Sequence, residues 1–220
     1  MKIVVVGHGG HSKVISDLIL QSGYEIHAYL DEKYREPIVK KNIIYGPINW
    51  ANKLIEDDFD IKFIIAIGNN KIRKQVVQIL HLTEDYYVTL IHQSAIVSPT
   101  SCIGAGTVVM PNAVINADSK IGQHTIINSG SIVEHDCQIG DFTHLSPRAV
   151  LTGAVQVNEG VSIGAGATVI PNIKIGEWAI VGAGATVIHD LPSKCTAVGV
   201  PAKIKSDSKD GGEEFVKYCI

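Results

Sequence analysis

The sequence has few charged side chains, few cysteines and no long hydrophobic run. Charged residues make up 19% and the net charge is −3, so the chain offers no basic surface for nucleic acid. No apolar run reaches the roughly 18 to 20 residues of a membrane helix, and the opening apolar stretch ends too early for a signal peptide. The four cysteines form no CxxC pair and are read as reduced thiols. We therefore expect a cytoplasmic chain with no membrane span and no nucleic-acid partner.

Glycine and branched aliphatic residues are abundant instead, and they recur with a period of six. From Ile91 to Val187, seventeen consecutive hexads begin with Ile, Leu or Val without one insertion. The fifth place is mostly small or β-branched, as an inward corner requires. The fourth place is Gly, Asn or Asp in ten of seventeen hexads, and these residues best tolerate a left-handed backbone. Short strands, tight turns and an aliphatic column predict a parallel β-helix of hexapeptide repeats.

The first ninety residues follow a different rhythm. A buried strand at 3–6, a Gly-rich turn, a helix near 11–22 and a strand at 26–30 form a β-turn-α-β unit. Further elements are expected as a helix at 47–57, a strand at 63–67 and a helix at 71–82. We predict a Rossmann-like α/β domain at 1–88, an all-β hexapeptide-repeat β-helix at 89–204 and a mobile polar tail at 205–220.

Three segments of the α/β domain are predicted to meet at the carboxyl edge of its sheet. The Gly-rich turn joins the first strand to a helix, where bare backbone N–H groups and the helix dipole hold phosphate. Asp31 ends the second strand, where a carboxylate reaches a ribose or uracil-like group, and Gly68-Asn69-Asn70 follows the third. The candidate nucleotide-sugar residues are Gly7, Gly9, Gly10, His11, Asp31, Gly68, Asn69 and Arg73.

The GxGGH turn, the Asp that ends the second strand, the GNNxxR segment and the uninterrupted hexads together resemble the sialic-acid O-acetyltransferase-like family. This resemblance, over about residues 2–204, implies a left-handed β-helix with three hexads per turn. It also implies transfer of acetyl from acetyl-CoA to the 4-amino group of a nucleotide-linked 4-amino-4,6-dideoxy sugar in bacterial glycan or polysaccharide biosynthesis. The N-terminal domain would then hold the nucleotide sugar, and the enzyme would be a homotrimer with intersubunit active sites.

The candidate base on the β-helix is His135, at the third place of its hexad. Its neighbours 18 residues away are Ala117 and Gly153, whose small size clears space beside the imidazole. Attack of an amine on a thioester needs a base, and the reference pKa of His, near 6.5, suits that task. The resemblance favours Asp136 as the carboxylate that orients His135, although corner geometry alone also explains an Asp there.

The same resemblance implies where acetyl-CoA binds. His144 resembles a family position that positions or polarises the thioester carbonyl. The Gly182-Ala183-Gly184 corner and the 199–203 segment resemble the stretch along which family members bind pantetheine. The candidate acetyl-CoA residues are His144, Gly153, Gly182, Ala183, Gly199, Pro201 and Lys203. No metal is expected.

The sixth place of many hexads is apolar and points outward. A lone β-helix would expose these side chains to water, so they predict an interface between subunits. The residues concerned are Val108, Val114, Ile126, Ile132 and Val150.

Other functions remain open on sequence grounds. The nearest is O-acetylation of a sugar hydroxyl by the same base. A metal-dependent hydratase is disfavoured because His124, His135 and His144 occupy different places of their hexads. A non-catalytic nucleotide-sugar sensor is the third. The sequence does not choose the nucleotide, the sugar stereochemistry or the length of the acyl chain.

Overall fold

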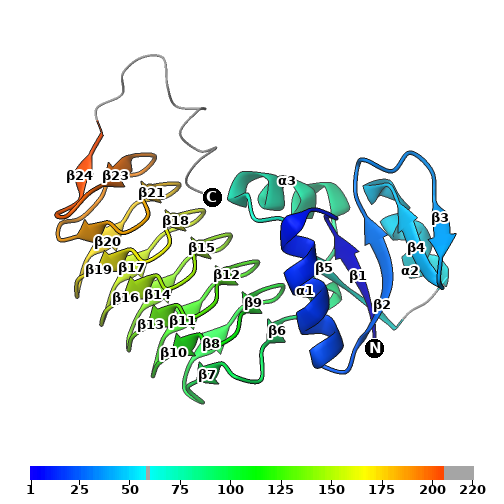
Figure 1. Cartoon of the computed structure of the whole chain (residues 1–220), viewed down its shortest axis with the longest axis horizontal. Coiled ribbons are helices and arrows are strands. Elements are labelled where there is room, and N and C mark those ends of the chain that lie inside the picture. Colours follow the sequence, from blue (N-terminus) through cyan, green and yellow to red (C-terminus); the bar gives the residue numbers. More distant parts are fainter. Residues whose placement is uncertain (58–59, 206–220) are drawn as a thin grey trace.

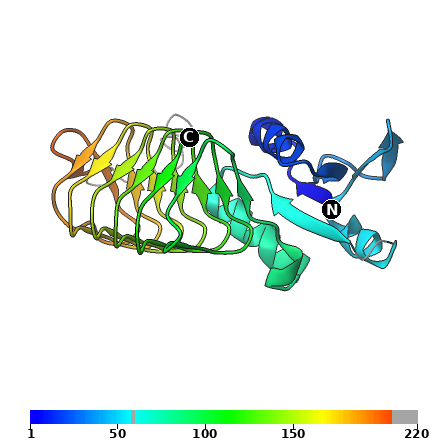
Figure 2. The same cartoon turned by 90° about the horizontal axis from the view of Figure 1, so that it is seen from below.

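The computed structural model describes residues 1–57 and 60–205. It has an α/β domain beside the first coils of a long β-helix (Figure 1, Figure 2). Of the predicted tail at 205–220, Lys205 is described and its N–H donates to the Thr196 carbonyl at 2.8 Å, whereas residues 206–220 lie outside the described residues. The predicted boundary between 88 and 89 falls between Tyr87, which still bridges to Phe63, and the next strand at Leu90.

The α/β domain has a five-stranded sheet in the order β3-β4-β2-β1-β5, parallel except for the edge pair β3–β4. Its parallel centre is buried on both faces, which explains the unbroken apolar run of the first strand. The predicted helix at 47–57 begins with a 3₁₀ turn, and the edge strands β3 and β4 were not predicted. The elements are β1 (Lys2–Val6), α1 (Gly10–Gln21), β2 (Glu25–Leu30), β3 (Ile38–Lys40), β4 (Ile43–Gly46), η1 (Ile48–Trp50), α2 (Ala51–Asp57), β5 (Ile61–Ile65), α3 (Asn70–Leu80) and η2 (Glu84–Tyr86).

The repeats form a left-handed β-helix with three hexads per turn, as predicted. Strands pair in parallel with strands 18 residues away, for example Val114 with Ile132. The strands are β6 (Leu90–Ile91), β7 (Ile96–Val97), β8 (Cys102–Ile103), β9 (Val108–Val109), β10 (Val114–Ile115), β11 (Lys120–Ile121), β12 (Ile126–Ile127), β13 (Ile132–Val133), β14 (Gln138–Ile139), β15 (His144–Leu145), β16 (Val150–Leu151), β17 (Gln156–Val157), β18 (Ser162–Ile163), β19 (Thr168–Val169), β20 (Lys174–Ile175), β21 (Ile180–Val181), β22 (Thr186–Val187), β23 (Thr196–Val198) and β24 (Lys203–Ile204).

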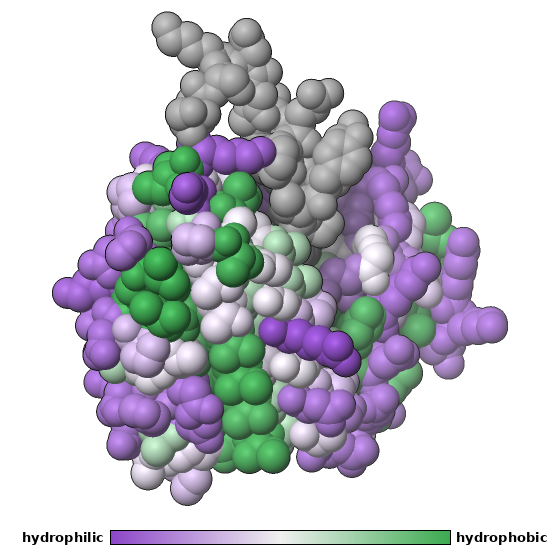
Figure 3. Space-filling model, turned by 60° about the vertical axis from the view of Figure 1, so that its left-hand side comes forward, coloured by the Kyte–Doolittle hydropathy of each residue, from purple (hydrophilic) through white to green (hydrophobic). Residues whose placement is uncertain are grey.

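The three faces of the β-helix differ in chemistry. The domain-facing sheet runs from β6 to β24 through β9, β12, β15, β18, β21 and β23. The apolar sheet is β7-β10-β13-β16-β19-β22, and the polar sheet is β8-β11-β14-β17-β20. The polar sheet turns Lys120, Gln138, Gln156 and Lys174 to solvent. The apolar sheet carries an outward stripe of aliphatic side chains: Ile96, Val114, Ile132 and Val150. Figure 3 shows a green, hydrophobic band on the surface of the molecule.

The domain-facing sheet packs against helix α1. Ile15 and Leu18 of α1 share one core cluster with Val108 and Ile126. Burying an aliphatic side chain of this size stabilises the fold by about 1.5 to 3 kcal/mol. The expectation that Val108 and Ile126 face another subunit is therefore wrong, because the chain's own N-terminal domain covers them to 2% and 1% exposure. Within the described residues, none of the helices is both long and apolar enough to cross a membrane.

Candidate functional site

A pocket of about 520 Å³ opens at the carboxyl edge of the α/β sheet. The turn after β1, the end of β2, the loop after β5 and one side of α3 line it. Six of the eight candidate nucleotide-sugar residues are among the lining residues: Gly7, Gly9, Gly10, His11, Asp31 and Gly68. The pocket therefore lies where parallel strands with connecting helices bind ligands.

The three glycines of the turn differ in whether the fold itself requires a glycine at that position. Gly7 has a φ of +97°, and a Cβ there would lie 2.6 Å from the Ile67 side chain, so the fold itself requires glycine. A Cβ on Gly9 or Gly10 would meet no atom within 4 Å. Both are exposed at the start of α1, so a ligand is free to approach their backbone.

Asp31 is held in place by main-chain N–H groups. Its Oδ2 accepts from the N–H of His8 at 2.6 Å, and its Oδ1 accepts from the N–H of Lys33 at 3.0 Å. The His8 ring stacks on Tyr29 with centroids 4.4 Å apart, and its Nδ1 lies 2.7 Å from the Tyr34 hydroxyl. Burial and the positive charge of Lys33 lower the pKa of His8. This aromatic group was missed from sequence, although Tyr29 precedes Asp31 by two residues and so shares its side of the strand.

Arg73 and Asn69 are not among the residues that line the pocket, although Asn69 directly follows Gly68, which does line it. The Asn69 side chain accepts from the N–H of Ile72 and so caps α3. Arg73 is 1% exposed, and its guanidinium donates to backbone carbonyls of the pocket loop and of the β-helix. The expectation that Arg73 contacts the nucleotide sugar is therefore withdrawn, because its donors are already used inside the protein.

His135 and Asp136 form a pair at the edge between the apolar and polar sheets. Nδ1 of His135 lies 2.7 Å from Oδ2 of Asp136, and both side chains are exposed. The hydrogen bond to Asp136 raises the pKa of His135, and the charges of Asp136 and Glu134 add to it. A Cβ at Gly153 would lie 2.7 Å from Cε1 and Nε2 of His135, so the imidazole occupies the space that glycine leaves. Nε2 makes no hydrogen bond within the described residues and is free to take a proton.

His144 lies on the domain-facing sheet beneath the N-terminal domain and is 9% exposed. Its Nε2 is 3.1 Å from Nδ2 of Asn128. Burial, with the charge of Arg73, lowers the pKa of His144 to about 3, although a hydrogen bond to the backbone of Gly68 opposes this shift. Burial likewise lowers the pKa of His11, a pocket residue, to about 4. Both imidazoles are neutral at pH 7, and the contact of His144 with acetyl-CoA stays a prediction.

The remaining acetyl-CoA candidates lie at the C-terminal end of the β-helix. Ala183 is exposed at the corner between β21 and β22, whereas Gly182 is buried and a Cβ there would meet the Val198 side chain at 2.7 Å. Gly199 has a φ of +98° in the turn that joins β23 to the antiparallel β24, and that turn also contains Pro201. Lys203, the first residue of β24, is exposed.

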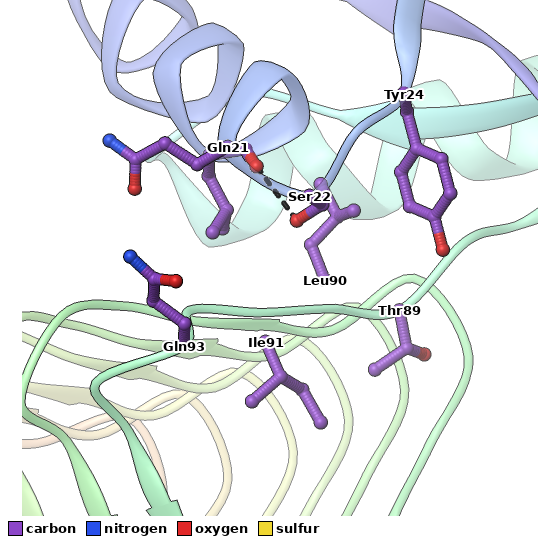
Figure 4. Close-up of a pocket in the computed structure, with 8 residues that line it drawn as sticks. Gln21, Ser22, Tyr24, Thr89, Leu90, Ile91 and Gln93 are labelled. Carbon is purple, nitrogen blue, oxygen red and sulfur yellow. Dashed lines mark hydrogen bonds between the residues drawn. The ribbon is translucent and has the colours of Figure 1, made fainter.

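A second hollow, of about 340 Å³, lies between the end of α1 and the first coil (Figure 4). The residues lining it, among them Gln21, Tyr24 and Gln93, include no charged side chain, so they offer no counter-charge to a diphosphate. Among residues 1–57 and 60–205 there is no group of three or more His, Cys, Asp or Glu residues able to hold a metal ion.

One chain does not bring the pocket and the His135 pair together. The N-terminal domain packs on the domain-facing sheet, whereas His135 lies at the edge shared by the other two sheets. In a three-sided prism that edge is opposite the domain-facing sheet. The two groups of residues therefore lie on opposite sides of the β-helix.

Comparison with known families identifies both parts of the chain. The model of the PglD N-terminal domain matches residues 2–80. The model of the bacterial transferase hexapeptide, which describes six repeats, matches residues 118–153 and 154–189.

Similar proteins are acetyltransferases. Perosamine N-acetyltransferase from Caulobacter crescentus, solved as a mutant with CoA and GDP-perosamine, is 38% identical with a TM-score of 0.86, over 94% of this chain and 98% of that one. The acetyltransferase domain of PglB from Neisseria gonorrhoeae FA1090, solved with acetyl coenzyme A, is 33% identical with a TM-score of 0.81, over 93% and 98%. UDP-N-acetylbacillosamine N-acetyltransferase from Bacillus subtilis (strain 168) is 50% identical over 109 residues, 49% of this chain. That match spans half of the Bacillus protein.

Proposed function

The chain belongs to the family of hexapeptide-repeat sugar N-acetyltransferases that carry a PglD N-terminal domain, and we propose that it acetylates the 4-amino group of a nucleotide-linked 4-amino-4,6-dideoxy sugar. Acetyl-CoA is the acyl donor. The observation that carries the proposal is the His135–Asp136 pair, with a free Nε2 beside the space left by Gly153.

The reaction is a direct transfer in a ternary complex. The sugar amine attacks the thioester carbonyl, and Nε2 of His135 takes the proton that the amine loses as the new C–N bond forms. The tetrahedral intermediate then expels CoA as its thiolate, which receives that proton, so His135 returns to its neutral form. Asp136 holds Nδ1 of His135 in its protonated form, which leaves Nε2 as the base, and stabilises the imidazolium.

The pocket of the α/β domain is the proposed site for the nucleotide sugar. Exposed N–H groups at Gly9 and Gly10 begin α1, where the helix dipole favours the diphosphate. Asp31 lies beside them at the end of β2 and retains acceptor capacity for a ribose hydroxyl or a base N–H.

The proposed assembly is a homotrimer whose active sites lie between subunits. Two features support it. The apolar sheet exposes a stripe of aliphatic residues that no other part of the described chain covers, with Ile96 66% exposed. In addition, the pocket and His135 lie on opposite sides of one β-helix, so the pocket of one subunit meets the base of a neighbour.

The proposal is tested by a thiol-release assay. The purified protein is given acetyl-CoA and a panel of UDP-, dTDP- and GDP-linked sugars with either an amino or a hydroxyl group at C4. We expect CoA release with a 4-amino sugar and none with its 4-hydroxy counterpart. Release with the hydroxy sugars alone would establish O-acetylation instead, and no release with any of them would reject the proposal.

A further inference from the structure

Arg73 is a fully buried cation without a carboxylate partner in the described part of the chain. Its acceptors are one side-chain amide and five backbone carbonyls. The donor–acceptor distances are 2.8 Å to His124 O, 2.9 Å to Ile67 O, 3.1 Å to Gly68 O, 2.8 Å to Asn70 Oδ1, 2.8 Å to Phe142 O and 3.3 Å to Thr143 O. Only the planar fork of arginine, with five N–H donors, serves so many acceptors at once.

These acceptors belong to two different parts of the protein. Nη1 holds the carbonyls of Ile67 and Gly68, in the loop between β5 and α3 that lines the pocket. Nε and Nη2 hold His124 and Phe142, which occupy the same corner in successive coils of the β-helix. Arg73 therefore ties the wall of the pocket to the β-helix.

The direction of the carbonyls determines the direction of the amides that follow them. In a planar trans peptide the C=O and the next N–H point in opposite directions. With the carbonyls of Ile67 and Gly68 turned toward Arg73, the N–H groups of Gly68 and Asn69 point away from it. Neither N–H has an acceptor within the described residues. A Cβ on Gly68 would meet no atom within 4 Å, so there is open space beside this residue, which also lines the pocket.

We propose that Arg73 is a positioning residue: it turns the Ile67 and Gly68 carbonyls inward and so presents the N–H groups of Gly68 and Asn69 to the diphosphate of the nucleotide sugar. This inference rests on the proposed function, because it needs a nucleotide sugar in the pocket. Arg73 itself does not touch the substrate. Its buried positive charge behind the loop also favours an anion in front of it.

The neighbouring Lys74 provides a matched control on the same helix. Its ammonium pairs with Glu159 and so also joins α3 to the β-helix, but it has no contact with Ile67 or Gly68. Arg73→Lys keeps the charge and loses the fork, whereas Lys74→Met removes an ion pair across the same interface.

The experiment measures binding of UDP, dTDP and GDP by calorimetry, and the KM values for nucleotide sugar and acetyl-CoA. For the nucleotide that binds the wild type, we expect Arg73→Lys to raise Kd by at least about tenfold, since hydrogen bonds from amides to a charged ligand are stronger than those between neutral groups. The KM for the nucleotide sugar should rise in parallel, while the KM for acetyl-CoA and the affinity of Lys74→Met stay at wild-type values.

Several outcomes would overturn the inference. An unchanged Kd in Arg73→Lys would do so while leaving the proposed function intact, and an equal loss in Lys74→Met would mean that Arg73 merely joins the domains. Absence of nucleotide binding by the wild type would reject both proposals. If Arg73→Lys does not fold, hydrogen exchange on the wild type decides: bound nucleotide should slow exchange at the amides of Gly68 and Asn69, and unchanged rates would refute the contact.

Discussion

Adding one methyl group at Gly153 should damage catalysis without unfolding the protein. The Cβ of Gly153→Ala would lie 2.7 Å from Cε1 and Nε2 of His135, about 1 Å inside normal contact. The imidazole is exposed and free to swing away, whereas the backbone of the coil is not. The φ of Gly153 lies outside the left-handed range, so the backbone accepts alanine and stability should change by no more than about 1 kcal/mol.

The loss of rate follows from the displacement of the base. Moving a catalytic group by about 1 Å costs on the order of 10²-fold in rate. The same movement breaks the 2.7 Å contact between His135 and Asp136 that orients Nε2. We therefore expect kcat in the thiol-release assay to fall about 10²-fold at saturating substrates.

Two variants make this test specific to the imidazole. In a His135→Ala background the added methyl has no ring to displace, so Gly153→Ala should cause no further loss. Ala117→Gly, on the other axial side of His135, adds no atom and should leave kcat unchanged. A wild-type kcat in folded Gly153→Ala would refute the reasoning, and a higher KM for acetyl-CoA with normal kcat would mean that Gly153 serves the cosubstrate alone.

His135→Ala should lower kcat by about 10²- to 10⁴-fold with both substrates still bound in calorimetry, whereas near-wild-type turnover would place the base elsewhere. Asp136→Asn should lower kcat less than His135→Ala does. It should also move the acid limb of the kcat–pH profile to lower pH, because Asp136 raises the pKa of His135 and only the neutral ring accepts a proton. An acid limb at the wild-type pH would contradict the role of Asp136 as the partner of His135. Ile132→Glu should convert the proposed trimer to monomers in light scattering, whereas the control Gln138→Glu, on the polar sheet, should stay trimeric. A trimer in both variants would exclude the apolar sheet as the interface. Burial lowers the pKa values of His11, His124 and His144, so on acidification these residues bind protons first in the unfolded state. The free energy of unfolding should therefore fall by a few kcal/mol as pH drops from about 6.5 to about 4, at about 1.4 kcal/mol per pKa unit. A free energy of unfolding that does not change with pH in urea titrations would contradict the burial of these residues as neutral rings.

The repeat was predictable because its signal is local and redundant. The first place of each hexad is aliphatic, and from Val97 onward these side chains pack in the core of the β-helix. The left-handed backbone at the fourth place extends beyond the residues that favour it, to His124, Phe142, Arg148, Ala154 and Trp178. The N–H of each of these residues is bonded to a carbonyl of the preceding coil. Stacking of the coils therefore imposes a positive φ that residue preferences alone did not predict.

To predict the chemistry of the three faces, one compares residues that lie 18 positions apart instead of six. Val114, Ile132 and Val150 lie 18 residues apart, as do Lys120 and Gln138 on the polar sheet. This 18-residue pattern is present in the sequence. The burial of Ile126 under α1, in contrast, could not be predicted from it. The burial of Arg73 could not be predicted, because three of its six acceptors are backbone carbonyls 51, 69 and 70 residues away.

The hydrogen bonds from Arg73 of α3 to the β-helix also bear on how two subunits form one active site. Arg73 binds the carbonyl of His124, in the same coil of the β-helix as His135. The pocket wall is thus anchored at the level of the base along the axis of the β-helix, although on the opposite side. A threefold rotation about a parallel axis changes the side and keeps the level. In the proposed trimer, therefore, the pocket of one subunit and the His135 of its neighbour stand at the same height, which direct transfer between their substrates requires.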